Sequence, residues 1–131
     1  MDKEAINKAL VELAEKKIEL AKTTYSDKNY DSIEDEVHEL EDDFIDEYEE
    51  DLNTLLEKVH EEFCSEEDVL HPTAYIANEY AKDGDNFKVA LNEGVLVDVD
   101  NLGEDEGRIV IVPNPLRILL NMSNKQVILW N

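Results

Sequence analysis

The chain has few of the residues that build disulfides, phosphate-binding loops and membrane helices. It contains one cysteine, Cys64, among 131 residues, so no internal disulfide can form and a reducing compartment is expected. Only four glycines occur, and none lies in a phosphate-cradling Gly-rich motif or a Gly-x-Ser-x-Gly elbow. No uninterrupted apolar run reaches the ~18 to 20 residues that a membrane helix needs. The chain is therefore expected to be neither a disulfide scaffold nor a nucleotide-binding domain of a common type.

The N-terminal residues and the length indicate one cytoplasmic domain. A secretion signal begins with a charged start and an apolar run, whereas residues 1–7 are mostly polar and Ile6 opens an amphipathic pattern. We therefore expect a cytoplasmic protein. A chain of 131 residues has room for one hydrophobic core. We expect a single domain over 1–131, with a helical part over 1–82 and a β part over 87–131.

Positive charge is scarce and unevenly distributed. The 12 Lys and Arg residues stand against 34 Asp and Glu residues, which gives a net charge of −22. This balance argues against direct binding to nucleic acid or to an anionic membrane, since both attract basic surfaces. Residues 31–68 hold 19 acids and one base, Lys58, whereas residues 108–131 hold three bases and no acid. Concentration of the acids in one segment favours a local role for them.

The spacing of apolar residues predicts helices in the first 82 residues. One amphipathic helix is expected over 2–24, and a longer one over 32–63. The polar turn at 26–29 predicts that these two helices pack antiparallel. A third, shorter helix is expected over 65–80, with a bend near Pro72. The stripe of the long helix steps by three or four residues: Ile33, Val37, Leu40, Phe44, Tyr48, Leu52, Leu55, Val59 and Phe63.

From Phe87 onward the apolar period changes to two, which is typical of strands. Residues 87–91 and 95–99 alternate and flank a turn at 92–94, so a hairpin is expected there. Three more strands are expected over 108–130. The predicted fold class is α+β: an N-terminal helical hairpin with a long acidic second helix and a short third helix, then a C-terminal antiparallel meander of about five strands.

The last three predicted strands are apolar at consecutive positions rather than at alternate ones. Such runs indicate that both faces of a sheet are covered. Two alternatives follow for the second face. Either a second copy of the chain covers it, giving a homodimer through the sheet, or the helices lie on both sides of the sheet.

The acids of the long helix are the main candidates for a functional site. At ~1.5 Å per residue, 19 charges over 38 residues correspond to about one per 3 Å, near the ~3.4 Å spacing in one DNA strand. DNA mimics and toxin immunity proteins use such surfaces to attract basic partners. The predicted partner-binding residues are Asp35, Glu39, Asp42, Asp43, Asp46, Glu47, Glu50 and Asp51.

These acids lead to two hypotheses of different class. The first is a non-catalytic protein that binds a basic protein as a DNA mimic or immunity-type inhibitor, with no cofactor. The second is a homo-oligomeric structural or interaction protein whose acidic face only solvates it. Like charges at i, i+4, such as Asp35 with Glu39, destabilise an isolated helix by ~0.2 to 0.5 kcal/mol per pair. Interspersed lysines would give solubility without that cost, which favours the first hypothesis.

A metal site is a further alternative. Glu57 and His60 show the Glu-x-x-His spacing of di-iron bundles, although such bundles need a second intact copy of it. The acidic loop over 98–106 resembles part of a calcium-binding loop. Four side chains of types that bind zinc also lie close in sequence, without the paired short spacings of structural zinc sites: Glu57, His60, Cys64 and His71.

Catalysis has little support in the sequence. Cys64 and His60 lie four residues apart, as a nucleophile and a base on one helix flank would. The surrounding carboxylates are expected to raise the pKa of the thiol, which opposes formation of a reactive thiolate. We therefore expect no enzymatic activity.

Overall fold

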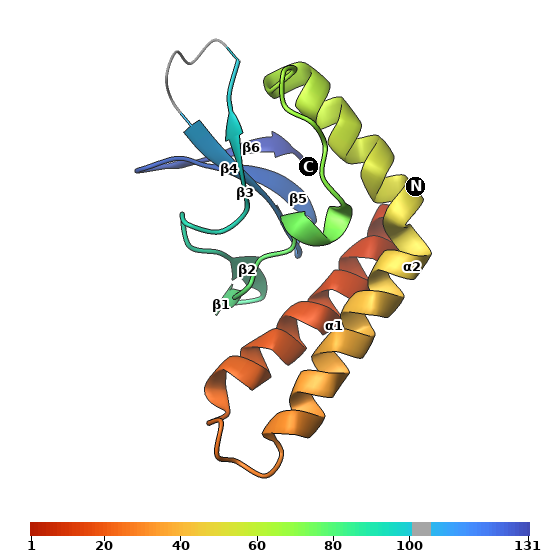
Figure 1. The fold of residues 1–131 in the computed structure, drawn as a ribbon, viewed down its shortest axis with the longest axis vertical. Helices are drawn as coiled ribbons and strands as arrows, with labels where there is room; N and C mark the ends of the chain where they lie inside the picture. The colour runs from red at the N-terminus through yellow and green to blue at the C-terminus, as the bar shows by residue number, and fades with distance from the viewer. Residues whose placement is uncertain (101–105) are drawn as a thin grey trace.

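Two long helices and six short strands make up the computed structural model, which describes residues 1–100 and 106–131 (Figure 1). The α+β class is thereby confirmed. No helix in the described part of the chain has the length and apolar character needed to cross a membrane. The elements are α1 (Lys3–Lys22), α2 (Tyr30–Phe63), the 3-10 turn η1 (Pro72–Tyr75), β1 (Ala81–Asp83), β2 (Asn86–Lys88), β3 (Val95–Asp98), β4 (Glu106–Val112), β5 (Arg117–Asn121) and β6 (Gln126–Trp130).

The helical hairpin forms as predicted. The Asp2 carboxylate accepts the Ala5 N–H at 3.0 Å and caps α1. α2 is one uninterrupted helix of 34 residues, and it packs against α1 through buried residues such as Phe44 and Leu52. At ~1.5 Å per residue α2 is about 50 Å long, against about 30 Å for α1. The C-terminal part of α2 therefore extends beyond α1 and packs against η1 and β6 (Figure 1).

The predicted third helix over 65–80 is wrong, since only the four residues of η1 form a helical turn there. Polar groups that would cap or form a helix here donate hydrogen bonds to side chains elsewhere in the fold. The Ser65 N–H and hydroxyl donate to the Asp100 carboxylate at 3.0 and 2.8 Å. The Leu70 N–H donates to the Tyr75 hydroxyl at 3.1 Å. Proline at the start of η1 also prevents a helix from passing through this position.

The strands form two antiparallel sheets. β3, β4, β5 and β6 make a four-stranded meander in that order, and β1 with β2 makes a separate hairpin around Gly84. The predicted hairpin of 87–91 with 95–99 is therefore wrong. β2 pairs with β1, and β3 pairs with β4.

The segment over 87–94 instead crosses one face of the four-stranded sheet. Carbonyl groups along it accept hydrogen bonds from sheet side chains, and these bonds replace the ones that a hairpin partner would have supplied. The donor residues on neighbouring strands lie opposite one another in the sheet, and the two on β5 are an even number of positions apart along the strand. Their side chains therefore lie on one face of the sheet. The bonds run from Arg117 to Phe87 (2.6 Å), Gln126 to Val89 (3.0 Å), Asn121 to Ala90 (3.1 Å) and Glu93 (2.9 Å), and Arg108 to Gly94 (3.3 Å).

This crossing segment explains the consecutive apolar runs of β4 and β5. Val110 and Leu119 lie on the crossed face and are buried. Ile109 and Ile118 lie on the opposite face, in the same buried cluster as Leu56 of α2. The second face is thus covered by the chain's own segment, and neither a second copy nor helices on both sides are needed to bury it.

Candidate functional site

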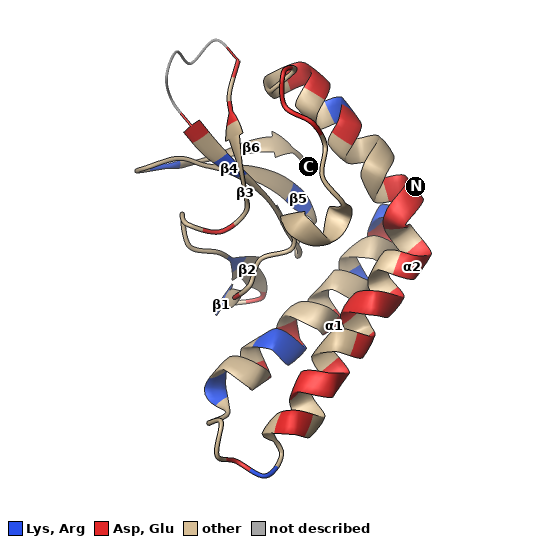
Figure 2. Cartoon of the chain, in the orientation of Figure 1, with Lys and Arg blue, Asp and Glu red and all other residues tan. Residues whose placement is uncertain are grey.

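The eight predicted partner-binding carboxylates all lie along α2. We call them the acidic ridge: Asp35, Glu39, Asp42, Asp43, Asp46, Glu47, Glu50 and Asp51. At about 100° per residue, six of them fall in one arc opposite the buried stripe that contains Phe44, and Glu47 lies beside that arc. Asp51 falls instead at the edge of the buried stripe, where it lines a hollow with Leu55 and Trp130. Seven of the eight are exposed, and Asp51 is half-buried. Acidic positions recur along the length of α2 in Figure 2, whereas Lys and Arg lie mainly on α1 and in the strands.

The acidic ridge carries no neutralising partner within residues 1–100 and 106–131. Five ion pairs form among these residues, and none involves a member of the ridge. Their acids are Glu15, Glu19, Glu36, Glu41 and Glu49. Four of these five acids are themselves about half exposed, so ion pairing depends on the position of the nearby cation and not on burial.

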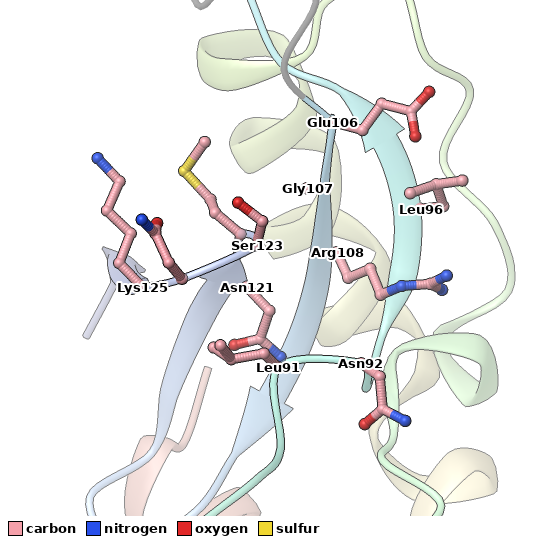
Figure 3. A pocket seen from close by; sticks show the side chains of 11 residues that line it. Leu91, Asn92, Leu96, Glu106, Gly107, Arg108, Asn121, Ser123 and Lys125 are labelled. Carbon is pink, nitrogen blue, oxygen red and sulfur yellow. The ribbon is translucent and has the colours of Figure 1, made fainter.

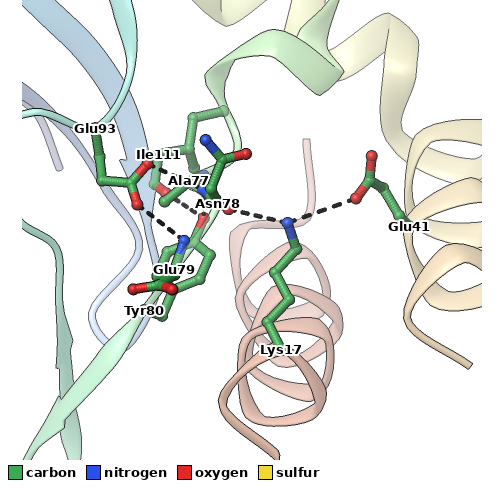
Figure 4. Close-up of polar contacts among 8 residues, drawn as sticks. All are labelled: Lys17, Glu41, Ala77, Asn78, Glu79, Tyr80, Glu93 and Ile111. Carbon is green, nitrogen blue, oxygen red and sulfur yellow. Dashed lines mark hydrogen bonds and ion pairs between the residues drawn. The ribbon is translucent and has the colours of Figure 1, made fainter. Parts of the chain in front are cut away.

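Two neighbouring lysines of α1 pair with acids of α2. The Lys16 ammonium lies 2.7 Å from Glu36 and 2.9 Å from Glu19, and these hydrogen bonds raise the pKa of Lys16. The Lys17 ammonium donates to the Ala77 carbonyl at 2.9 Å and lies 3.6 Å from Glu41 (Figure 4). Lys17 thereby connects both helices to the segment that precedes the strands.

Replacing Lys17 with methionine is expected to lower the free energy of unfolding by about 1 kcal/mol, because the Ala77 carbonyl loses its donor in a partly buried position. A methionine side chain retains most of the apolar length of the lysine side chain, so the substitution removes mainly the ammonium group. Lys16→Met is the matched control, since that side chain is 26% exposed against 12% for Lys17, and its ion pairs are expected to contribute less than ~0.5 kcal/mol. Urea unfolding measures both variants, and equal losses would contradict the bridging role.

A buried carboxylate that the sequence reasoning missed holds the same segment from the other side. Both oxygens of Glu93 accept backbone N–H groups, from Asn78 at 3.0 Å and from Glu79 at 2.9 Å (Figure 4). Beside it, the Tyr80 hydroxyl donates to the Ile111 carbonyl at 2.9 Å, and burial raises the pKa of Tyr80. The Glu93 carboxylate is therefore satisfied internally and is not part of an acidic surface.

The structure does not bring the four zinc-ligand candidates together. Both ring nitrogens of His60 are engaged, Nε2 with the Tyr75 hydroxyl at 2.8 Å and Nδ1 with the Glu67 carbonyl at 3.1 Å. Glu57 is exposed on α2. His71 is exposed too, and its Nδ1 bonds the backbone and hydroxyl of the nearby threonine in η1.

Cys64 is buried, and burial raises the pKa of its thiol to about 11, with a further contribution from nearby carboxylates. Within the described residues no three His, Cys, Asp or Glu side chains are arranged to hold a metal ion. The calcium-like loop falls largely on residues 101–105, which lie outside the described part of the chain.

An open hollow of about 770 Å³ lies beside the β5–β6 turn (Figure 3). Leu91 of the crossing segment, Leu96 of β3 and Arg108 of β4 line it, together with the turn residues up to Lys125. At its floor, the Asn121 amide group donates to the crossing segment, while its Oδ1 is buried and has no hydrogen-bond partner among the described residues. Sequence reasoning missed this hollow because its lining comes from separate segments that only the sheet brings together.

Comparisons with known protein families, with curated proteins and with solved structures found no match to this chain. The functional conclusion therefore depends on the geometry and charge of the sites described above.

Proposed function

We propose that this protein is a non-catalytic binding protein that engages a basic protein through the acidic ridge of α2. One observation carries the proposal: seven exposed carboxylates of the acidic ridge lie along one continuous helix, and none of them is in an ion pair within the described residues. Adjacent like charges on a helix are mutually destabilising. A surface rich in Lys and Arg relieves that repulsion when it binds.

The position of the acidic ridge supports this function. The helical hairpin extends away from the strands, and its distal part is not covered by them (Figure 1). Clustered charges of one sign attract an opposite surface over about a Debye length, ~8 to 10 Å at physiological salt, and accelerate association. A groove that accepts a row of phosphates presents suitable cations at a similar spacing. A DNA-binding protein or a basic nuclease is therefore the proposed class of partner, and masking of its groove is the proposed action.

Reversal of four ridge charges tests the proposal: Glu39→Lys, Asp42→Lys, Asp43→Lys and Asp46→Lys in one variant. Binding of basic DNA-binding and nuclease domains to the immobilised protein is measured at low salt, with duplex DNA as competitor. We expect the wild-type protein to bind at least one such domain competitively with DNA. The variant is expected to bind it at least tenfold more weakly, a difference of about 1.4 kcal/mol.

A second reversal variant serves as the control for net charge. It changes four exposed acids outside the acidic ridge by the same total charge: Glu66→Lys, Asp68→Lys, Asp83→Lys and Asp85→Lys. If the acidic ridge is the site, this control keeps most of the affinity. Equal weakening by both variants, or no binding by the wild-type protein, would instead favour an acidic surface that only solvates the molecule.

A further inference from the structure

The two edges of the four-stranded sheet differ. On the β3 side, the chain itself occupies backbone donors: the Asp98 N–H donates to the Glu67 carboxylate at 3.1 Å, and the Asp100 N–H donates to the Phe63 carbonyl at 2.8 Å. On the β6 side, no strand of the described chain lies beyond the edge. Val127 and Ile128 are 38% and 55% exposed there. The β3 edge is thus partly occupied by the chain itself, and the β6 edge is open and apolar.

The hydrogen-bond pattern of the β5–β6 hairpin shows which backbone groups point outward. The Met122 N–H donates to the Lys125 carbonyl at 2.8 Å, so these two residues face each other across the hairpin. Inward and outward groups alternate along an antiparallel strand. Val127 therefore directs its N–H and C=O toward β5, and Gln126 and Ile128 direct theirs away from it.

We propose that β6 pairs antiparallel with β6 of a second copy of the chain, which joins two four-stranded sheets into one of eight strands. The outward groups define a symmetric register. Gln126 of each protomer lies opposite Ile128 of its partner, with both N–H···O bonds formed, and Val127 lies on the two-fold axis. Gln126–Trp130 contains no charged residue and no proline, two of the devices that block such pairing. The irregularity in the pairing of β6 with β5 falls at Leu129, beyond the three residues that define the register.

The charge distribution favours a second copy as the occupant of this edge. Each protomer carries a net charge of −22, so most of its surface repels another copy. Residues 106–131 hold one acid, Glu106, and three bases. Leu129 and Trp130, at the far end of the strand from Gln126, line a hollow together with α2 residues such as Leu55 and Val59. Pairing centred on Val127 therefore brings together the least acidic part of each protomer.

The size of this contact determines its strength. A strand of five residues buries less than the ~1,200 Å² that marks the low end of specific interfaces. The dimer is therefore weak and reversible. Salt screens the repulsion between the two acidic protomers, so dimerisation increases with ionic strength. Binding of a basic partner by the acidic ridge has the opposite salt dependence, and the two proposals fail independently.

Sedimentation velocity over a concentration series at low and high salt provides the first test. Ile128→Lys places a charge on the edge, and Ile128→Pro removes an outward N–H without removing a bond to β5. Leu96→Lys is the matched control, because Leu96 is 51% exposed but lies on β3. Wild-type protein and the Leu96 variant are expected to dimerise alike, and both Ile128 variants are expected to raise the dissociation constant roughly tenfold or more. A wild-type protein that stays monomeric at high salt and high concentration would overturn the proposal.

Amide hydrogen exchange provides a second test with residue resolution. As the concentration of wild-type protein rises, exchange at Gln126 and Ile128 is expected to slow, while Val127 stays protected throughout by its bond to β5. Far-UV circular dichroism confirms that the Ile128 variants are folded. Exchange at Gln126 and Ile128 that does not change with concentration would exclude pairing through this edge.

Discussion

Replacing Gly94 with alanine is expected to lower the free energy of unfolding by about 3 to 5 kcal/mol. Gly94 has φ +111°, a conformation that side chains of L-residues rarely adopt. A Cβ atom there would lie 2.6 Å from the Ile109 carbonyl oxygen and 3.1 Å from the Val110 Cβ. These atoms belong to the central strand β4, so the β4 backbone cannot move aside without breaking hydrogen bonds of the sheet. Backbone strain and steric overlap therefore add.

Gly84→Ala is the matched control for this prediction. Gly84 also has a positive φ, +66°, but no heavy atom lies within 4 Å of a Cβ built there. Gly84→Ala should lower the free energy of unfolding only through the strain of an L-residue at positive φ, by about 1 to 2 kcal/mol. Urea unfolding followed by circular dichroism measures both variants. Similar losses for the two would show that close packing of the crossing segment on β4 does not contribute to stability.

The helical hairpin could be predicted because its information is local. The stripe of α2 repeats every three or four residues, and the acids between the apolar positions must then lie on the solvent side. The third helix failed for the opposite reason. Ser65 carries a good capping side chain, but it bonds Asp100, which lies 35 residues later in the chain. The local sequence pattern cannot show that the hydroxyl expected to cap a helix is instead hydrogen-bonded to a residue far away in the chain.

The predicted hairpin failed on the same kind of long-range contact. Residues 87–91 alternate as a strand does, yet their carbonyl groups bond to side chains such as Asn121 and Gln126 on later strands. The prediction that both faces of the last three strands are covered is confirmed for β4 and β5 but is wrong for β6, where Val127 and Ile128 are exposed. The segment that covers β4 and β5 could not be predicted, because the crossing segment over 87–94 is irregular and is held by hydrogen bonds from sheet side chains. Such a segment leaves no periodic pattern of apolar residues in the sequence. Glu93 was missed because one acid in a turn resembles any solvent-exposed turn residue.

Replacing Glu93 with glutamine is expected to lower the free energy of unfolding by about 2 to 3 kcal/mol. The carboxylate is 9% exposed and accepts two backbone N–H groups, from Asn78 and Glu79. A glutamine side chain offers one acceptor, and its NH₂ group would face the other backbone donor without forming a bond. Hydrogen bonds to charged groups contribute ~1.5 to 3 kcal/mol each, and a donor left unsatisfied costs ~1 to 3 kcal/mol.

Glu79→Gln separates this effect from a change of charge. Glu79 is adjacent in space and exposed, so its side chain should contribute less than ~0.5 kcal/mol. Hydrogen exchange at the Asn78 and Glu79 amides should accelerate in the Glu93 variant and not in the Glu79 variant. Unchanged exchange at both amides would contradict the assigned role of Glu93.

The same variant separates stability from the proposed binding. Glu93 holds the segment whose Ala77 carbonyl receives Lys17, and Lys17 reaches Glu41 of α2 (Figure 4). Most of the acidic ridge lies on the other side of that helix, and the ridge shares no contact with this network among the described residues. Below its unfolding transition, the Glu93→Gln protein should therefore bind a basic partner as well as the wild type does. A loss of binding that matched the loss of stability would place the binding surface on this segment instead of on α2.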